Sequence, residues 1–266
     1  MPPTTYVDAA IERVDTERGG AAAKLSAVES FADRVESLSP ASSRAGAPSV
    51  AGSGGVARRA DARGSRGCES VRNAFAETVR SQTAPDTGGK QGGPGPLQAA
   101  IRREFTESIA VALAPASDVS FSPRLKQAVL TAARNRQSEL TVLCRTLDRE
   151  RASLRTAAEA VDAIASWIAA ADGTPLSELG FDALRGRHET LADHRERCDG
   201  VAADRQSFLA ATTAHDGDAG LRHRDLAASL YGALSVDHPL LTTVSRLDDA
   251  CGECQRAVRA HLVRRA

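Results

Sequence analysis

Aromatic side chains are scarce in this sequence, where they make up 3% of 266 residues. A core with so few rings must be built from Ala, Leu and Val, which suit close helix packing better than a sheet, because sheets favour β-branched and aromatic side chains. Apolar runs of the ~20 residues that a membrane span needs are also absent. The opening residues MPPTTY lack the basic segment followed by an apolar one that marks a signal peptide. These absences predict a soluble, cytoplasmic protein with no membrane partner.

The sequence has no excess of either charge, since 34 basic residues balance 34 acidic ones. The charge of the whole chain therefore points neither to nucleic acid nor to an anionic membrane as a partner. The five cysteines are odd in number and widely spaced, which argues against a disulfide framework. The chain is long enough to bury a sizeable core in one or two domains.

The most prominent pattern in the chain is a long helix that starts at Ser122-Pro123. Ser suits the N-cap and Pro suits the first helical position, and no further Pro or Gly occurs until Gly173. Apolar residues recur along the stretch at alternating steps of four and three, which is the heptad spacing of coiled-coil packing. The segment 172–175, DGTP, combines the residues that end a helix and turn the chain. A helix of this length needs other helices to cover its apolar stripe.

Other segments repeat the helical spacing. Long helices are predicted from the heptad positions of 6–38, 181–212 and 240–262, and shorter helices over 68–80 and 97–113. No segment shows the alternation of a strand. The predicted fold class is therefore all-α, an antiparallel long-helix bundle with coiled-coil heptad packing, in a single elongated domain over residues 1–266.

Two segments interrupt the helical pattern. Residues 39–67 are rich in Gly, Ser and Arg and predict a disordered insertion, and 81–96 predict a flexible loop. In that loop Gly88-Gly89-Lys90 fails as a phosphate-binding motif, because Ala84 and Gln91 stand where Gly and Ser or Thr are required. The insertion carries five arginines, Arg44, Arg58, Arg59, Arg63 and Arg66, without the interleaved aromatic residues typical of nucleic-acid binding.

The sharpest chemical motif is the pair of thiols Cys251 and Cys254 in a CxxC arrangement. Such a pair can bind zinc or exchange disulfides, but a structural zinc site needs two more ligands, for which Cys198 and His261 are the nearest candidates. Both sulfurs fall on heptad positions inside a helix, where Cys acts as a small buried hydrophobe. We therefore predict packing roles for both, with no metal and no cofactor. No GxSxG or HExxH motif occurs, and no catalytic residues are predicted.

Four charged residues occupy core-type heptad positions, namely Arg136 and Glu150 in the long helix and Arg195 and Arg205 in the following one. The turn at 172–175 should fold these two helices antiparallel. Counting equal distances from that turn predicts that Glu150 pairs with Arg195 or Arg205, and it favours Arg195. Arg136 is expected to meet solvent.

Several stretches resemble an uncharacterised haloarchaeal coiled-coil family, which is known only as a domain of unknown function. The similar stretches are YVDAAIERVDTERGG and FADRV near the start, FSPRLKQAVLTAARNRQSEL in the middle, and FDALRGRHETLADHRERCDGVAADRQSFL and LYGALSVDHPLLTTVSRL towards the end. The resemblance spans nearly the whole chain apart from 39–67. It implies a helical protein from a halophilic archaeon with no known activity. The neutral net charge departs from the acidic composition that is usual in halophile proteins.

The patterns favour a non-enzymatic helical scaffold or protein-interaction protein, because extended helical surfaces suit self-association or a helical partner. Two alternatives remain. One is a nucleic-acid-associated protein that uses the Arg-rich insertion and the C-terminal arginines Arg256, Arg259, Arg264 and Arg265. The other is a thiol or metal sensor that uses Cys251 and Cys254.

Overall fold

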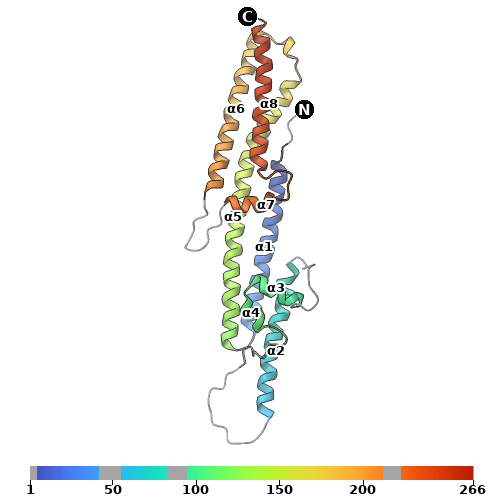
Figure 1. The fold of residues 1–266 in the computed structure, drawn as a ribbon, viewed down its shortest axis with the longest axis vertical. Coiled ribbons are helices and arrows are strands. Elements are labelled where there is room, and N and C mark those ends of the chain that lie inside the picture. Colours follow the sequence, from blue (N-terminus) through green and yellow to red (C-terminus); the bar gives the residue numbers. More distant parts are fainter. Residues whose placement is uncertain (1–4, 42–54, 83–94, 212–222, 266) are drawn as a thin grey trace. The chain divides into compact units, whose positions relative to one another are not determined.

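A computed structural model describes residues 5–41, 55–82, 95–211 and 223–265, and within these ranges it contains helices and no strands (Figure 1). The predicted all-α class is confirmed. The helices are α1 (Val7–Ser37), α2 (Gly55–Glu77), α3 (Pro96–Glu104), α4 (Glu107–Ala112), α5 (Pro123–Asp172), α6 (Phe181–Ala210), α7 (His223–Tyr231) and α8 (Pro239–Val263), with short 3-10 turns η1 (Arg80–Gln82) and η2 (Leu176–Glu178). None of the described helices combines the length and hydropathy that crossing a membrane requires.

Helix α5 is the long helix that the sequence predicts, with 50 residues. Its first turn is capped by Ser122, whose hydroxyl accepts a hydrogen bond from the Leu125 backbone N–H at 3.2 Å. Pro123 follows as the first helical residue, where its missing N–H costs nothing. The helix ends at Asp172, directly before Gly173, as the predicted turn requires.

The chain divides into two compact units. Unit 1 contains residues 1–18 and 145–266, and unit 2 contains residues 19–144. Helices α1 and α5 each contribute one segment to each unit. The expectation of one elongated domain over 1–266 stays a prediction.

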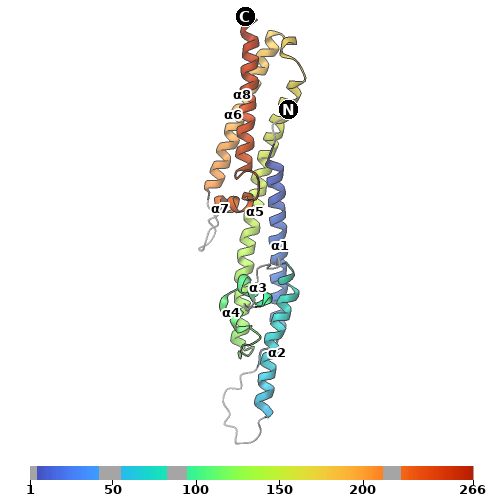
Figure 2. The same cartoon turned by 45° about the vertical axis from the view of Figure 1, so that its right-hand side comes forward.

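In unit 1, α5, α6 and α8 lie side by side (Figures 1 and 2). From Glu150 to Trp167 along α5, the contacted residues of α6 run backwards from Arg205 to His194. Similar contacts join His188 of α6 to Gln255 of α8 and Arg195 to Asp248. Neighbouring helices are therefore antiparallel, as predicted. The side chains that fill this core are aliphatic and fully buried, among them Leu154, Ile164, Leu184, Leu191 and Leu247.

Three of the scarce aromatic residues form a cluster in unit 2. The rings of Phe31, Phe75 and Phe105 pack against one another, with centroids 5.3 to 5.8 Å apart. They come from α1, from α2 and from the residue after α3, so one cluster holds three segments together. A ring cluster of this kind contributes through its large buried area and its edge-to-face contacts.

The structure changes two of the predicted boundaries. Residues 55–67, which the sequence analysis placed in a disordered insertion, belong to α2 in the structure. Disorder of the segment 39–67 stays a prediction. The stretch VARRADAR contains strong helix formers. The helix then packs closely at Gly67, where an added Cβ would lie 2.6 Å from the Cβ of Phe121. Residues 42–54 of the predicted insertion and 83–94 of the predicted loop lie outside the described residues.

The second changed boundary is in the helix predicted over 97–113, which is two helices. Helix α3 ends at Glu104, and Thr106 caps α4 by accepting a hydrogen bond from the Ile109 N–H at 3.3 Å. The cap turns the chain and lets Phe105 join the ring cluster. Threonine competes for backbone hydrogen bonds in this way, which is why it favours helix starts over helix interiors.

Candidate functional site

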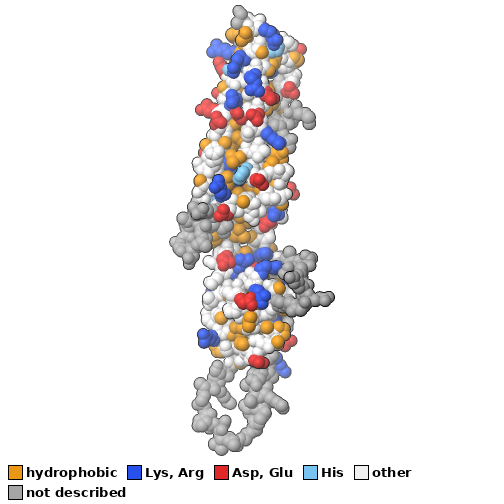
Figure 3. Space-filling model, viewed as in Figure 1, with side chains coloured by type: hydrophobic (Ala, Val, Ile, Leu, Met, Phe, Trp, Pro, Cys, Tyr) orange, Lys and Arg blue, Asp and Glu red, His pale blue; other side chains and the backbone are white. Residues whose placement is uncertain are grey.

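A groove of about 820 Å³ lies on unit 2 between the α3–α4 pair and the first turns of α5. Its α5 wall extends from Arg124 to Glu139, and its middle is lined by the small side chains Ala128, Thr131 and Ala132. The opposite wall is residues 103–109. The face of unit 2 over α3 and α4 mixes acidic, basic and apolar side chains (Figure 3). The groove is therefore lined by apolar and charged side chains together.

The break between α3 and α4 shapes this groove. Because the two helices are joined only by Phe105 and Thr106, they form a short corner against α5. Ile109 and Ala110 point into the core of unit 2 and are buried, which fixes α4. The walls are therefore built on packed helices and not on loops.

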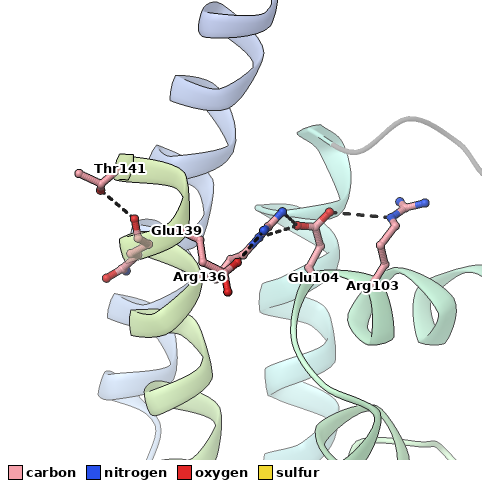
Figure 4. A network of polar contacts seen from close by, with 6 residues as sticks. Arg103, Glu104, Arg136, Glu139 and Thr141 are labelled. Carbon is pink, nitrogen blue, oxygen red and sulfur yellow. Dashed lines mark hydrogen bonds and ion pairs between the residues drawn. The ribbon is translucent and has the colours of Figure 1, made fainter. Parts of the chain in front are cut away.

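An ion pair crosses the inner edge of the groove, from Arg136 of α5 to Glu104 of α3 (Figure 4). Arg136 donates Nη2 and Nε to Glu104 Oε2 at 3.0 and 3.2 Å, and donates Nη1 to Glu139 Oε2 at 2.8 Å. The Glu104 side chain is only 3% exposed, and Arg103 Nε lies 3.9 Å from its other oxygen. The expectation that Arg136 meets solvent was wrong, because α3 packs over that face of α5.

The acidic partners keep Arg136 charged. Burial of the guanidinium lowers its pKa, but the hydrogen bond to Glu139 and the charge of Glu104 outweigh this effect, so the pKa is raised overall. A charged Arg136 leaves the buried Glu104 carboxylate paired, as a buried carboxylate requires.

A second buried network lies in unit 1 at Glu150. Arg205 donates Nη2 and Nη1 to the two Glu150 oxygens at 2.7 and 3.0 Å, and the Tyr231 hydroxyl also donates to Glu150. The side chains of Arg205 and Glu150 are 4% and 1% exposed. The predicted pairing of Glu150 with an arginine of the next helix is confirmed, but the favoured partner was wrong. Arg195 instead binds Asp248 of α8, with Nε 2.8 Å from Oδ1.

His223 lies beside this network, at the start of α7. Its ring is buried and lies 4.3 Å from the ring of Phe208, and its Nδ1 has no hydrogen-bond partner among the described residues. Burial lowers the pKa of His223, and the nearby Glu150 carboxylate partly offsets this, while Arg149 and Arg205 add to the lowering. His223 and Tyr231 belong to no motif, and the heptad pattern of α5 and α6 gives no signal for either.

The CxxC pair is split between two environments. Cys251 is buried and Cys254 is exposed, so the predicted packing role holds for Cys251 and is wrong for Cys254. Burial raises the pKa of Cys251 to about 12, and neighbouring Cys198 adds to the rise. Among the described residues, no three His, Cys, Asp or Glu side chains lie close enough together to hold a metal ion.

These features define an all-helical protein with two buried charge networks and a groove along its longest helix. A family model described as "Domain of unknown function (DUF7260)" matches residues 5–255, and the chain belongs to this family. The predicted resemblance to a domain-of-unknown-function family is thereby confirmed at the level of the family. No curated protein and no solved structure matches the chain.

Proposed function

We propose that the chain is a non-enzymatic helical protein whose groove in unit 2 binds a helix of a partner protein. The groove is the observation that supports this proposal. Its α5 wall from Arg124 to Glu139 extends for about four helical turns, or roughly 22 Å. That length matches the segment of a partner helix that places three or four side chains in a groove at helical spacing.

The side chains in the groove favour a helix over an extended peptide. Ala128, Thr131 and Ala132 leave room on the α5 wall for a second helix to approach closely, as small residues do at helix crossings. Phe105, which is half-buried, supplies apolar surface on the opposite wall. The two walls together offer a partner helix an apolar floor flanked by polar edges.

Charge favours an acidic residue on the partner helix near one end of the groove. Arg124 is exposed and forms no ion pair with any described residue. Glu104, by contrast, is already bonded to Arg136 inside the groove. A partner carboxylate facing Arg124 would gain a charged contact, which chiefly raises the association rate and the specificity.

Site-specific photo-crosslinking tests this proposal. A benzoylphenylalanine at Ala128 should give a discrete protein adduct in an extract of the organism that encodes the chain. The same probe at Ser138, which is exposed on α5 but does not line the groove, should not give that adduct. An adduct with a second copy of the chain would identify self-association through the groove.

Blocking the groove provides the second arm. Thr131→Trp in the Ala128 probe variant should abolish the adduct, whereas Ser138→Trp should leave it unchanged. Equal adducts from both probe positions, or an adduct that survives Thr131→Trp, would contradict the proposal. Circular dichroism of each variant checks that the helices are retained.

The proposal also includes a haloarchaeal origin, coiled-coil packing of the long helices and a cytoplasmic location, which rest on the sequence alone.

Nucleic-acid binding by the Arg-rich segment is the first alternative, and it predicts an affinity for DNA that falls steeply with salt. A fluorescence-anisotropy titration of duplex DNA at low and at high salt distinguishes that alternative from a protein partner. A sensor that uses Cys251 and Cys254 together conflicts with their different exposure.

A further inference from the structure

A pocket of about 250 Å³ lies in unit 1, where α5 turns into α6. Its floor is formed by the buried side chains Leu191 and Val258. The half-buried side chains of Trp167 and Ile168 form one wall. The pocket is separate from the groove, which lies in unit 2.

Four polar side chains line the pocket, namely Asp172, Thr174, Arg187 and Cys254. Arg187 donates Nη1 to the Thr174 carbonyl oxygen at 3.2 Å, which holds its guanidinium against the turn. Burial raises the pKa of the Cys254 thiol, and Asp172 adds to the rise more than Arg187 opposes it. Burial and the charge of Asp172 therefore both favour the neutral thiol over the thiolate.

We propose that this pocket binds a small, neutral aromatic molecule of one or two fused rings that carries a hydrogen-bond donor. Apolar cavities of about 150 Å³ hold a benzene ring, so 250 Å³ gives room for a bicyclic ring such as indole. The indole ring of Trp167 offers an aromatic wall on which a ligand ring can pack. The Asp172 carboxylate, at the C-terminal end of α5, can accept a hydrogen bond from a ligand N–H.

The pocket also excludes other ligand classes. A long acyl chain exceeds its volume. The Asp172 carboxylate and the carbonyl end of α5 oppose an anion, against the attraction of the single Arg187 guanidinium, which is already bonded to the Thr174 carbonyl. Arg187 lines the same pocket and opposes a cation, so the two charges together select a neutral ring.

Indole is the probe for the test, with two independent readouts on the full chain. Trp167 is the only tryptophan, so biosynthetic 5-fluorotryptophan gives a single-site fluorine NMR signal. This signal should shift saturably as indole is added. At indole about ten times above Kd, alkylation of Cys254 by N-ethylmaleimide should slow about tenfold, because a ligand in the pocket covers the Cys254 thiol that lines it. Alkylation of Cys144, in unit 2, should not change.

Two matched substitutions locate the binding. Ala257 and Ala260 are both exposed on α8, but only Ala257 lines the pocket. Ala257→Phe should therefore abolish the saturable shift and the protection of Cys254, whereas Ala260→Phe should leave both intact. Circular dichroism of both variants checks that they keep their helices.

The charge of the ligand is tested with indole-3-carboxylate, which should bind at least about tenfold more weakly than indole, a difference of about 1.4 kcal/mol. A fluorine signal that does not saturate with indole would overturn the proposal. So would equal affinity in Ala257→Phe and Ala260→Phe, or tighter binding of the anion than of indole.

Discussion

The charged side chains that are buried in the described part of this protein are paired with groups of opposite charge. Glu150 accepts hydrogen bonds from Nη1 and Nη2 of Arg205 and from the hydroxyl of Tyr231. Each of its two oxygens therefore has a donor, in a site where the side chain is only 1% exposed. A buried pair of this kind adds little net stability, because desolvation offsets the attraction. Its effect is to fix which turn of α6 faces which turn of α5.

Removing one member of the pair should be far more costly than removing both. Arg205→Ala leaves the Glu150 carboxylate buried and uncompensated, and should lower the free energy of unfolding by about 3–5 kcal/mol. The triple variant Glu150→Leu, Arg205→Met and Tyr231→Phe should be close to the wild type, since apolar residues replace the pair and no buried hydroxyl loses its acceptor. Urea unfolding of both variants measures these changes. Equal losses in the two variants would contradict the argument.

Tyr231 allows a milder test of the same network. Tyr231→Phe removes only the hydroxyl that donates to Glu150, and hydrogen bonds to charged groups contribute about 1.5–3 kcal/mol. Arg195→Ala is the comparison, because Arg195 pairs with Asp248 at the surface, where solvent screens the charges. Urea unfolding should therefore show a clearly larger loss for Tyr231→Phe than for Arg195→Ala. A larger loss of unfolding free energy in Arg195→Ala than in Tyr231→Phe would contradict this prediction, because the surface pair would then contribute more than the buried network.

His223 should make the stability depend on pH. Its pKa is lowered in the folded protein, chiefly by burial, so the unfolded chain binds the proton more tightly. The contribution of neutral His223 to stability is present above its unfolded pKa of about 6.5 and is lost as the pH falls through its lower folded pKa. His223→Gln should flatten the decline of the urea midpoint between about pH 8 and about pH 5. An unchanged slope in that variant would assign the decline to other groups.

At the scale of the helices, the sequence predicted the elements better than their partners. Ser122-Pro123 and Gly173 mark the ends of α5 because caps are local, and a local pattern is readable from a single sequence. The partner of Glu150 depends on the connection between α5 and α6. The turn η2 and its neighbours lengthen that connection, so α6 begins at Phe181 and Arg205 comes to face Glu150.

The groove was less predictable than the helices that build it. Arg136 is a charged residue at a core-type heptad position, which indicates that this face of α5 is not a purely apolar seam. Its partner Glu104 lies on a different helix with no periodic relation to it. The groove also depends on the break at Thr106, which a helical spacing of apolar residues conceals. Long-range pairing of this kind requires the three-dimensional structure.

Two glycines with different surroundings test the packing of α1 and α2. At Gly67 an added Cβ would meet the Phe121 Cβ at 2.6 Å, and overpacking of this kind costs about 1–3 kcal/mol. At Gly19, inside α1, no atom lies within 4 Å of an added Cβ, so Gly19→Ala should stabilise by about 0.5–1 kcal/mol through helix propensity. Thermal unfolding followed by circular dichroism should shift in opposite directions for Gly67→Ala and Gly19→Ala. A shift in the same direction would mean that α2 does not pack against Phe121 as described.

At the scale of the whole chain, each unit has its own buried core, while α1 and α5 are continuous helices that belong to both. Trp167 lies in unit 1 and the ring cluster of Phe31, Phe75 and Phe105 lies in unit 2. Fluorescence of the single tryptophan therefore reports on unit 1, and far-ultraviolet circular dichroism reports on both units. The predicted single domain can therefore be tested by a substitution in unit 2 and a measurement of the unfolding of unit 1 through Trp167 fluorescence.

Phe75→Ala should destabilise unit 2 by about 3–5 kcal/mol, because it removes a fully buried ring and leaves a cavity in the cluster. Since breaking α1 and α5 at their middle would leave helical segments without packing partners, we expect the loss to reach unit 1. The urea midpoint seen by Trp167 fluorescence should then fall together with the midpoint seen by circular dichroism. Glu77→Ala, which removes an exposed ion pair with Arg34 in the same unit, is the control and should move neither midpoint appreciably. A Trp167 midpoint that stays in place while the circular-dichroism transition splits would show that the two units unfold separately, and the prediction of one domain would be wrong.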